Sequence, residues 1–227
     1  RKTVNIEKLS AKHIISFLGV SNNLSLYVNG KFAGYSEGSH NTAEFDITSL
    51  LAEGTNELIV VMFKWCNGTF LECQDMFREN GIFRDVLLYN YPESYIYDFE
   101  AVTEKSKKGY DLTVKTVLGD DKNCTVKAEL YDREKNLLAE KEVKGEKEIT
   151  FKSLDVKEWN AEIPVCYALY LTVLKDGKEA MTVRQFIGFR TIKIENGIFY
   201  VNDKPIKVKG VNHHDTDLYK GYSMSLE

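Results

Sequence analysis

The sequence predicts a mainly β protein built from antiparallel sandwiches, and three observations lead to this fold class. Short runs rich in β-branched and aromatic residues recur along the 227-residue chain. Tight-turn signals separate these runs, among them Asn29-Gly30, a dipeptide that favours two-residue hairpins because both residues tolerate positive φ. No long stretch has the apolar spacing of an amphipathic helix. Such a pattern is typical of β-sandwiches.

Four short strands are predicted near the N-terminus, at residues 14–20, 24–28, 31–35 and 43–51. In the last of these an edge strand leads into a short turn, where Thr48 or Ser49 could cap one helical turn. Residues 58–65 are almost continuously apolar, which predicts a strand buried on both faces.

Residues 73–86 concentrate polar chemistry between two strand-like runs. Asn80-Gly81 predicts a tight turn, and residues 82–89 then predict a strand of mixed burial. Upstream of the turn, Asp75, Arg78 and Glu79 lie in a loop that could direct charges into a shared cavity. The alternative is a salt-bridged corner between two sheets.

Pro92 separates this region from a second set of strands. These are predicted at residues 96–103, 110–118, 125–131, 137–143, 149–151, 168–175 and 180–186. Within the second of them Leu112 and Val114 should face inward while Thr113 and Lys115 face outward. Turn signals recur about every 8–12 residues, which is typical of an immunoglobulin-like sandwich.

The C-terminal part begins with a predicted hairpin at residues 192–202, with its turn at Asn196-Gly197. Residues 206–212 then predict a strand that ends at Asn212.

Composition narrows the range of functions. The formal net charge is −4, with acidic and basic residues mixed along the chain. A basic stripe for nucleic acid is missing from the sequence, and no apolar run approaches the ~20 residues of a membrane helix. We therefore expect neither a nucleic-acid nor a membrane partner.

The four cysteines form no CxxC pair and have no metal-like spacing with histidine. Cys66 and Cys73 flank Asn67-Gly68, so a disulfide between them is geometrically possible, but we favour buried thiols that fill space as small apolar side chains. The chain begins Arg1-Lys2-Thr3 without a signal-like apolar stretch. We expect it to be a fragment of a larger protein.

Eight segments form an ordered series of motifs along the chain: residues 26–35, 43–47, 74–78, 81–86, 188–190, 194–197, 201–205 and 210–215. In this order they resemble the family 2 β-galactosidases of the bacterial, lactose-hydrolysing type. The resemblance covers the chain from about Asn23 to Asp217, and shared order over that length is stronger evidence than any single motif.

The resemblance implies three domains. Residues 1–91 would be the C-terminal part of a sugar-binding jelly roll, residues 92–189 an immunoglobulin-like sandwich, and residues 190–227 the start of a catalytic TIM (β/α)₈ barrel. Trp159 would anchor the core of the middle domain. In such barrels active-site residues follow the C-terminal ends of the strands, which is where residues 212–215 fall.

The resemblance also implies the site residues. Asp75 would accept hydrogen bonds from galactose hydroxyls and hold a monovalent cation, because a carboxylate is a good acceptor and a hard oxygen ligand. His214 would bind a sugar hydroxyl, and Asn212 would bind substrate or orient its neighbours. His213 departs from the arginine expected at its position. The alternatives are a capping role for Asp75, and a metal cluster or a surface loop for residues 213–215.

The implied parent enzyme hydrolyses terminal non-reducing β-D-galactosides such as lactose with retention. Its two catalytic glutamates would lie beyond residue 227, so the fragment should be inactive. We expect no cofactor in the fragment, Mg²⁺ and Na⁺ in the parent, a homo-oligomeric parent and a cytoplasmic location. A sister enzyme (β-glucuronidase or β-mannosidase) and a non-catalytic carbohydrate-binding or adhesion sandwich are the alternatives.

Overall fold

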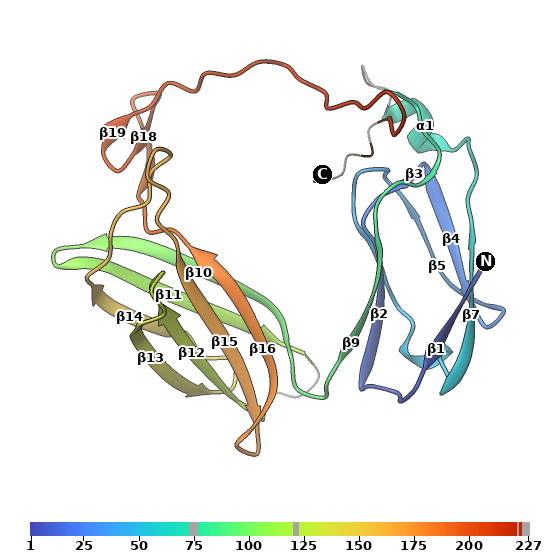
Figure 1. Ribbon diagram of the computed structural model, residues 1–227, viewed down its shortest axis with the longest axis horizontal. Coiled ribbons are helices and arrows are strands. Elements are labelled where there is room, and N and C mark those ends of the chain that lie inside the picture. Colours follow the sequence, from blue (N-terminus) through green and yellow to red (C-terminus); the bar gives the residue numbers. More distant parts are fainter. Residues whose placement is uncertain (73–76, 120–122, 222, 224–227) are drawn as a thin grey trace. The chain divides into compact units, whose positions relative to one another are not determined.

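The computed structural model describes residues 1–72, 77–119, 123–221 and 223. The chain divides into two compact units (Figure 1). Unit 1 comprises residues 1–91 and 211–227, and unit 2 comprises residues 92–210. Within the described ranges, no helix combines the length and the apolar character needed to cross a membrane.

Unit 1 is a small β-sandwich, as the sequence predicts. One sheet has the strand order β1 (Lys2–Ile6), β7 (Gly54–Val61), β4 (Asn23–Val28), β5 (Lys31–Glu37). The second sheet has the order β6 (Ala43–Asp46), β2 (Lys12–Phe17), β9 (Val86–Tyr91), and β3 (Val20–Ser21) pairs with β8 (Gly81–Ile82). A 3-10 turn at Thr48–Leu50 and the short helix α1 (Asn67–Leu71) complete the unit.

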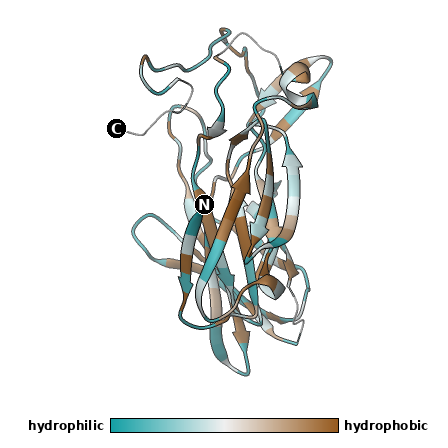
Figure 2. Cartoon of the chain, turned by 90° about the vertical axis from the view of Figure 1, so that its right-hand side faces the viewer, coloured by the Kyte–Doolittle hydropathy of each residue, from teal (hydrophilic) through white to brown (hydrophobic). Residues whose placement is uncertain are grey.

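The core of unit 1 forms where the strands turn their apolar residues inward. Phe17, Leu24, Leu26 and Ile47 are essentially inaccessible to solvent. Both hydrophobic and hydrophilic residues occur along the strands in Figure 2. Burial alternates in β4, where Leu24, Leu26 and Val28 are buried and the residues between them are not, as expected when one face of a sheet is covered.

The hairpin between β4 and β5 turns at Asn29-Gly30, which confirms the strongest turn prediction. Both residues have positive φ (51° and 77°). The Asn29 side chain also accepts a 2.8 Å hydrogen bond from the Glu57 backbone N–H and donates one of 2.9 Å to the Leu50 carbonyl. The turn is therefore held by its neighbours as well as by local preference.

Strand β7 differs from the strand predicted at residues 58–65. It ends at Val61, and only alternate residues such as Asn56 and Leu58 are buried. The next aromatic residues, Phe63 and Trp65, are about 60% exposed (62% and 58%). A continuous apolar run was therefore a poor guide here, because its second half belongs to a loop at the end of the sandwich.

The strand predicted at residues 82–89 is split into β8 and β9. Between them the Phe83 ring and the Arg84 stem pack against Gly19, where an added Cβ would lie 2.8 Å from the ring. The Arg84 Nη1 donates hydrogen bonds to the carbonyls of Leu18 (3.3 Å) and His40 (3.5 Å). This clamp lies where the chain stops pairing with β3 and begins to pair with β2. An arginine suits such a junction because its planar guanidinium can donate to two carbonyls at once.

Unit 2 is a sandwich of two antiparallel sheets, and all seven strands predicted for this region are present. One sheet has the order β10 (Ile96–Ser106), β11 (Gly109–Leu118), β14 (Ile149–Leu154). The other has the order β13 (Leu137–Lys144), β12 (Thr125–Tyr131), β15 (Tyr167–Lys175), β16 (Lys178–Ile187).

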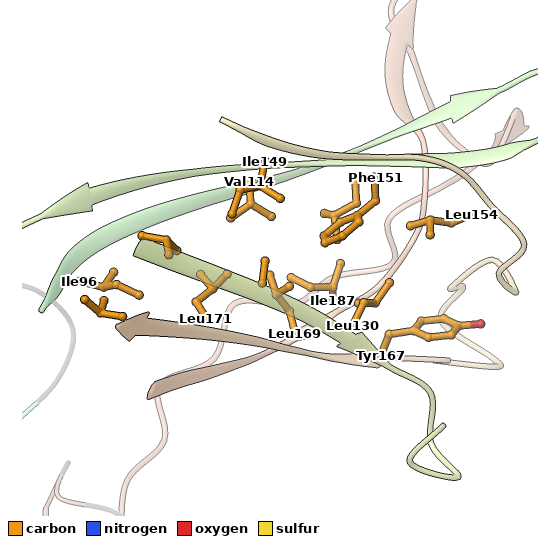
Figure 3. Close-up of a cluster of buried hydrophobic side chains, with 14 of the residues drawn as sticks. Ile96, Val114, Leu130, Ile149, Phe151, Leu154, Tyr167, Leu169, Leu171 and Ile187 are labelled. Carbon is orange, nitrogen blue, oxygen red and sulfur yellow. The ribbon is translucent and has the colours of Figure 1, made fainter. Parts of the chain in front are cut away.

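The core of unit 2 lies between these sheets. Figure 3 shows Val114 and Ile149 from one sheet directed toward Leu169 and Leu171 from the other. Leu112 and Val114 are fully buried, while the intervening residues of β11 are not. The predicted alternation is confirmed.

Trp159 is half-buried and joins several parts of unit 2. Its ring packs on Gly188, where an added Cβ would lie 3.0 Å away, and the Arg190 guanidinium lies 4.7 Å from the ring centroid. Its carbonyl accepts a 2.9 Å hydrogen bond from Asn202 Nδ2. Trp159 thus holds the C-terminal hairpin against the sandwich and lies at the margin of the core.

That hairpin, β17 (Ile192–Glu195) and β18 (Ile198–Val201), turns at Asn196-Gly197 as predicted, and β19 (Lys204–Pro205) adds a short third strand. The strand predicted at residues 206–212 is absent from the structure. A parallel barrel strand takes its hydrogen bonds from neighbouring barrel strands, and none of the described strands flanks this segment. The barrel part of the fold prediction is therefore not seen.

Candidate functional site

A cleft of about 260 Å³ opens at one end of unit 1. It is lined by residues 21–22, 39–41, 64–65 and 77–80 together with Thr69 and Glu72. These are the connections that follow β3, β5 and β7 and that precede β8, with α1 beside them (Figure 1). A sandwich brings loops distant in sequence together at its ends, which is where function usually resides.

The floor of the cleft carries buried hydroxyl groups. Ser21, Ser39 and Thr69 are each less than 10% exposed (5%, 4% and 7%). The Glu72 carboxylate accepts a 2.6 Å hydrogen bond from Ser39 Oγ and two of 3.2 Å from its backbone N–H. The floor is therefore a preorganised set of hydroxyl and carboxylate oxygens.

Side-chain hydrogen bonds tie the loops of the cleft to one another. Ser21 Oγ donates to the Glu79 carbonyl (2.9 Å). Asn22 Nδ2 donates to the Lys64 carbonyl and to Asn80 Oδ1 (3.3 Å). Each bond joins segments more than 40 residues apart, so the cleft is held by tertiary contacts.

The rim of the cleft is aromatic. Trp65 and Phe77 are 58% and 59% exposed. The Trp65 ring lies 6.2 Å from Phe70 at an interplanar angle of 24°, and Lys64 Nζ lies 5.5 Å from its centroid. Exposed rings above a polar floor are suited to ligands with both hydroxyl groups and apolar ring faces.

Asp75, the main site residue predicted from the sequence, lies outside the described residues. Its described neighbours in the chain, Glu72 and Phe77, both line the cleft. Cys73 is likewise outside the described residues, while Cys66, Cys124 and Cys166 are thiols. The thiol favoured for Cys66 is therefore confirmed, although its side chain is only partly buried.

Asn212, His213 and His214 belong to unit 1 but are exposed and do not line the cleft. His213 Nε2 and Asp215 Oδ1 are 2.7 Å apart on the surface, with side chains 68% and 74% exposed. The structure therefore does not bring His214 and Asn212 to the cleft.

The chain just beyond His214 does reach the cleft. Ser223 Oγ donates a 2.8 Å hydrogen bond to the Phe83 carbonyl, and Gly221 packs directly against Glu79, a lining residue. Asp217 accepts backbone hydrogen bonds from Tyr219 and Lys220 (2.8 Å each), which lower the pKa of its carboxyl.

A metal site is not formed by the described part of the chain, where no three His, Cys, Asp or Glu side chains gather. Asp75, the residue expected to hold a monovalent cation, lies outside the described residues.

Sequence reasoning missed most of the cleft. Trp65 was assigned to a strand, and Glu72 and Ser39 belong to no recognisable pattern. Glu72 could have been suspected from its position two residues before the Gln74-Asp75 motif.

Two models of the same family match the chain. The one described as "Glycosyl hydrolases family 2, sugar binding domain" matches residues 1–92. The one described as "Glycosyl hydrolases family 2" matches residues 94–190. Together they account for both sandwiches.

Curated relatives agree with this match. A "Beta-galactosidase" of Actinobacillus pleuropneumoniae is 36% identical over 226 residues, covering 99% of this chain and 22% of the relative. A "Beta-galactosidase" of Streptococcus thermophilus is 36% identical over 233 residues, with the same two shares. The chain thus spans about a fifth of the length of these relatives.

Solved structures show the same fold. A β-glucuronidase from Ruminococcus gnavus in complex with D-glucaro-d-lactam has a TM-score of 0.84 at 22% identity, covering 99% of this chain and 41% of that one. At this identity the likeness concerns the fold alone. From the two family models and the curated relatives we conclude that the chain belongs to glycosyl hydrolase family 2.

Proposed function

We propose that the complete protein is a retaining β-galactosidase that hydrolyses terminal non-reducing β-D-galactosides such as lactose. The observation that supports this most strongly is the match to proteins named β-galactosidase along almost the whole chain. The cleft of unit 1, with its hydroxyl floor and aromatic rim, is chemically suited to a sugar.

In this proposal Asp75 accepts hydrogen bonds from galactose hydroxyls, since an ionised carboxylate is purely an acceptor. Phe77, two residues later in the sequence, and Glu72, three residues earlier, both line the cleft.

His214 would hydrogen-bond a sugar hydroxyl, because a neutral imidazole can donate and accept at once. Asn212 would orient its neighbours or contact the substrate. The exposure of both residues suits a role that is completed by further parts of the protein.

Retaining hydrolysis needs an acid/base and a nucleophilic carboxyl about 5–5.5 Å apart. We place both glutamates beyond residue 227, so residues 1–227 would bind and position the sugar without cleaving it. A monovalent cation at Asp75, Mg²⁺ elsewhere in the protein, a homo-oligomeric state, a cytoplasmic location and the domain boundaries at 91/92 and 189/190 remain predictions.

The proposal is tested by kinetics of the complete protein with 4-nitrophenyl glycosides that differ only in the sugar. We expect kcat/KM for the β-galactoside to exceed that for the β-glucuronide and the β-mannoside by at least about 100-fold, because a site that hydrogen-bonds specific hydroxyls rejects analogues strongly. Faster hydrolysis of either other sugar would assign the protein to a sister activity. Sugar binding without hydrolysis of any glycoside would favour the non-catalytic alternative.

A further inference from the structure

Four Asn-Gly dipeptides occur in the sequence, at residues 29–30, 67–68, 80–81 and 196–197. Asn-Gly is chemically labile as well as turn-forming, because glycine has no side chain to shield its backbone nitrogen from the amide carbon of the preceding asparagine. The fold places the four dipeptides in different surroundings. These surroundings distinguish the one dipeptide that can react in the folded protein from the three that are held.

Asn196-Gly197 is the turn of the β17–β18 hairpin and leaves both reacting atoms accessible. Glu195 pairs with Ile198, so the two central residues lie beyond the last pair of the ladder. Both are exposed, and nothing lies within 4 Å of the position that a Cβ on Gly197 would take. Among the described residues, none makes a hydrogen bond to the Asn196 side chain. Its amide carbon is therefore free to turn toward the Gly197 nitrogen.

Asn29-Gly30 has the same turn geometry but a fixed side chain. Its φ values are 51° and 77°, against 50° and 74° in the β17–β18 turn. Asn29 Oδ1 accepts a 2.8 Å hydrogen bond from the Glu57 N–H. Its Nδ2 donates to the Leu50 carbonyl (2.9 Å) and to Asn56 Oδ1 (2.8 Å). The Asn29 amide cannot turn toward the next backbone nitrogen until these bonds open.

Secondary structure and a hydrogen bond restrain the other two dipeptides. Asn67 and Gly68 belong to α1, and Gly68 is buried. In a helix the asparagine side chain leans toward the N-terminus, away from the nitrogen that follows it. Asn80 Oδ1 accepts a 3.3 Å hydrogen bond from Asn22 Nδ2, and β8, which pairs with β3, begins at the next residue.

We propose that Asn196 is the site at which the folded protein deamidates spontaneously. The Gly197 amide loses its proton to hydroxide, and its nitrogen attacks the side-chain carbon Cγ of Asn196. A C–N bond forms and the bond from Cγ to the side-chain nitrogen breaks, so that ammonia leaves with a proton from water and a cyclic succinimide remains. Water then opens the ring at either carbonyl and gives aspartate or isoaspartate, without any oxidation or reduction.

The two products should affect the hairpin differently. Isoaspartate inserts an extra carbon atom into the backbone of a two-residue turn whose residues both need positive φ. The register of a hairpin depends on its turn, so the isoaspartate form should have weaker pairing between β17 and β18. Aspartate adds only a charge and leaves the backbone unchanged.

The test is peptide mapping of the complete protein after incubation in the folded state at mildly alkaline pH. Mass spectrometry quantifies conversion in the peptides that contain the four dipeptides. Asn196 should be converted first, and Asn29 should react at least about tenfold more slowly because its side-chain hydrogen bonds must open beforehand. Residues 67 and 80 should also react more slowly. In denaturant all four should react at similar rates, since the protection comes from the fold.

Two variants separate the steps. Gly197→Ala keeps Asn196 but places a methyl group beside the attacking nitrogen, so conversion at residue 196 should be largely lost. Asn196→Asp carries the charge of the product on the original backbone. Freshly prepared, it should show the same hydrogen exchange in β17 and β18 as the unchanged protein, whereas the isoaspartate form should exchange faster.

Conversion of residue 29, 67 or 80 in the folded protein as fast as that of residue 196 would overturn the proposal. So would an intact Asn196 in the folded protein under conditions where the denatured protein reacts. Equal hydrogen exchange in the isoaspartate and unchanged forms would overturn the effect on the hairpin. None of these outcomes depends on the proposed enzymatic function.

Discussion

Ser223 Oγ donates a 2.8 Å hydrogen bond to the main-chain carbonyl of Phe83, 140 residues earlier in the chain. Two residues before Ser223, Gly221 lies so close to Glu79 that an added Cβ would stand 1.1 Å from the carboxylate, and its φ is +62°. The segment that follows His214 is therefore packed against the edge of the cleft, which joins two regions that sequence reasoning assigned to one sugar site.

The first prediction concerns this contact. Gly221→Ala should separate the segment from the cleft edge, because the position lacks both space and a favourable φ. In the complete protein, hydrogen exchange should then accelerate at residues 79–83. Gly197→Ala is the matched control, since Gly197 also has a positive φ (+74°) but nothing within 4 Å. Unchanged protection in Gly221→Ala would show that the contact does not form.

The second prediction concerns the core of unit 2. Leu169 is fully buried between the two sheets, so Leu169→Ala should lower the free energy of opening of unit 2 by about 2–5 kcal/mol through lost burial and a residual cavity. Hydrogen exchange of β12 and β15 measures that free energy. Leu137→Ala, at a position 49% exposed, should cost far less. Similar costs for the two variants would contradict the described core.

The third prediction is a pH dependence at Glu158. Its carboxylate accepts hydrogen bonds from Lys105 Nζ (2.7 Å) and Tyr110 Oη (2.9 Å), and the Lys105 bond is the main cause that lowers the pKa of Glu158. A lowered pKa means that the folded state favours the ionised form. The stabilisation is then present above the ordinary value of 4.5 and is lost as the pH falls through the folded-state pKa.

Glu158→Gln should accordingly destabilise unit 2 at neutral pH, and the difference from the unchanged protein should shrink as the pH is lowered below about 4. Hydrogen exchange or denaturant titration across this range provides the measurement. A difference that stays constant with pH would mean that the charge of Glu158 has no role.

The fourth prediction concerns the attachment of the C-terminal hairpin. Asn202 donates from Nδ2 to the Trp159 carbonyl and accepts at Oδ1 from the Thr191 N–H (3.0 Å). Asn202→Asp keeps the acceptor but places a carboxylate oxygen against the Trp159 carbonyl. The free energy of opening of the hairpin should therefore fall by about 1–3 kcal/mol. Asn196→Asp, at the same φ of 50° in the β17–β18 turn, should have little effect. Equal exchange rates in β17 and β18 of both variants would rule out this role.

Local signals were sufficient for most of the sandwich fold. In unit 2 the strands alternate between buried and exposed residues and end at turn residues. The two-residue hydrophobic period and the turn residues therefore predicted strand bounds close to those observed, as for β12 at Thr125–Tyr131. Asn29-Gly30 and Asn196-Gly197 were equally clear, because their positive φ values are a property of the dipeptides themselves.

Features that depend on distant partners could not be predicted in this way. Nothing local distinguishes Trp65 in a loop from a residue of β7, because its exposure depends on which strands continue beside it. Residues 206–212 show the opposite error: their alternating pattern predicts a strand, but a strand forms only where a neighbouring strand supplies hydrogen bonds. The floor of the cleft, built from Ser21, Ser39 and Glu72, exists only through tertiary hydrogen bonds.

The central claim is that Asp75 and His214 bind the same galactose, and a double-mutant cycle on kcat/KM of the complete protein for a β-galactoside tests it most directly. Asp75→Ala, His214→Ala and the double variant should show a coupling of at least about 1 kcal/mol, as groups that share one ligand do. If the two losses simply add, to within about 0.4 kcal/mol, or if either variant keeps full activity, the two residues do not share a sugar and the account is wrong.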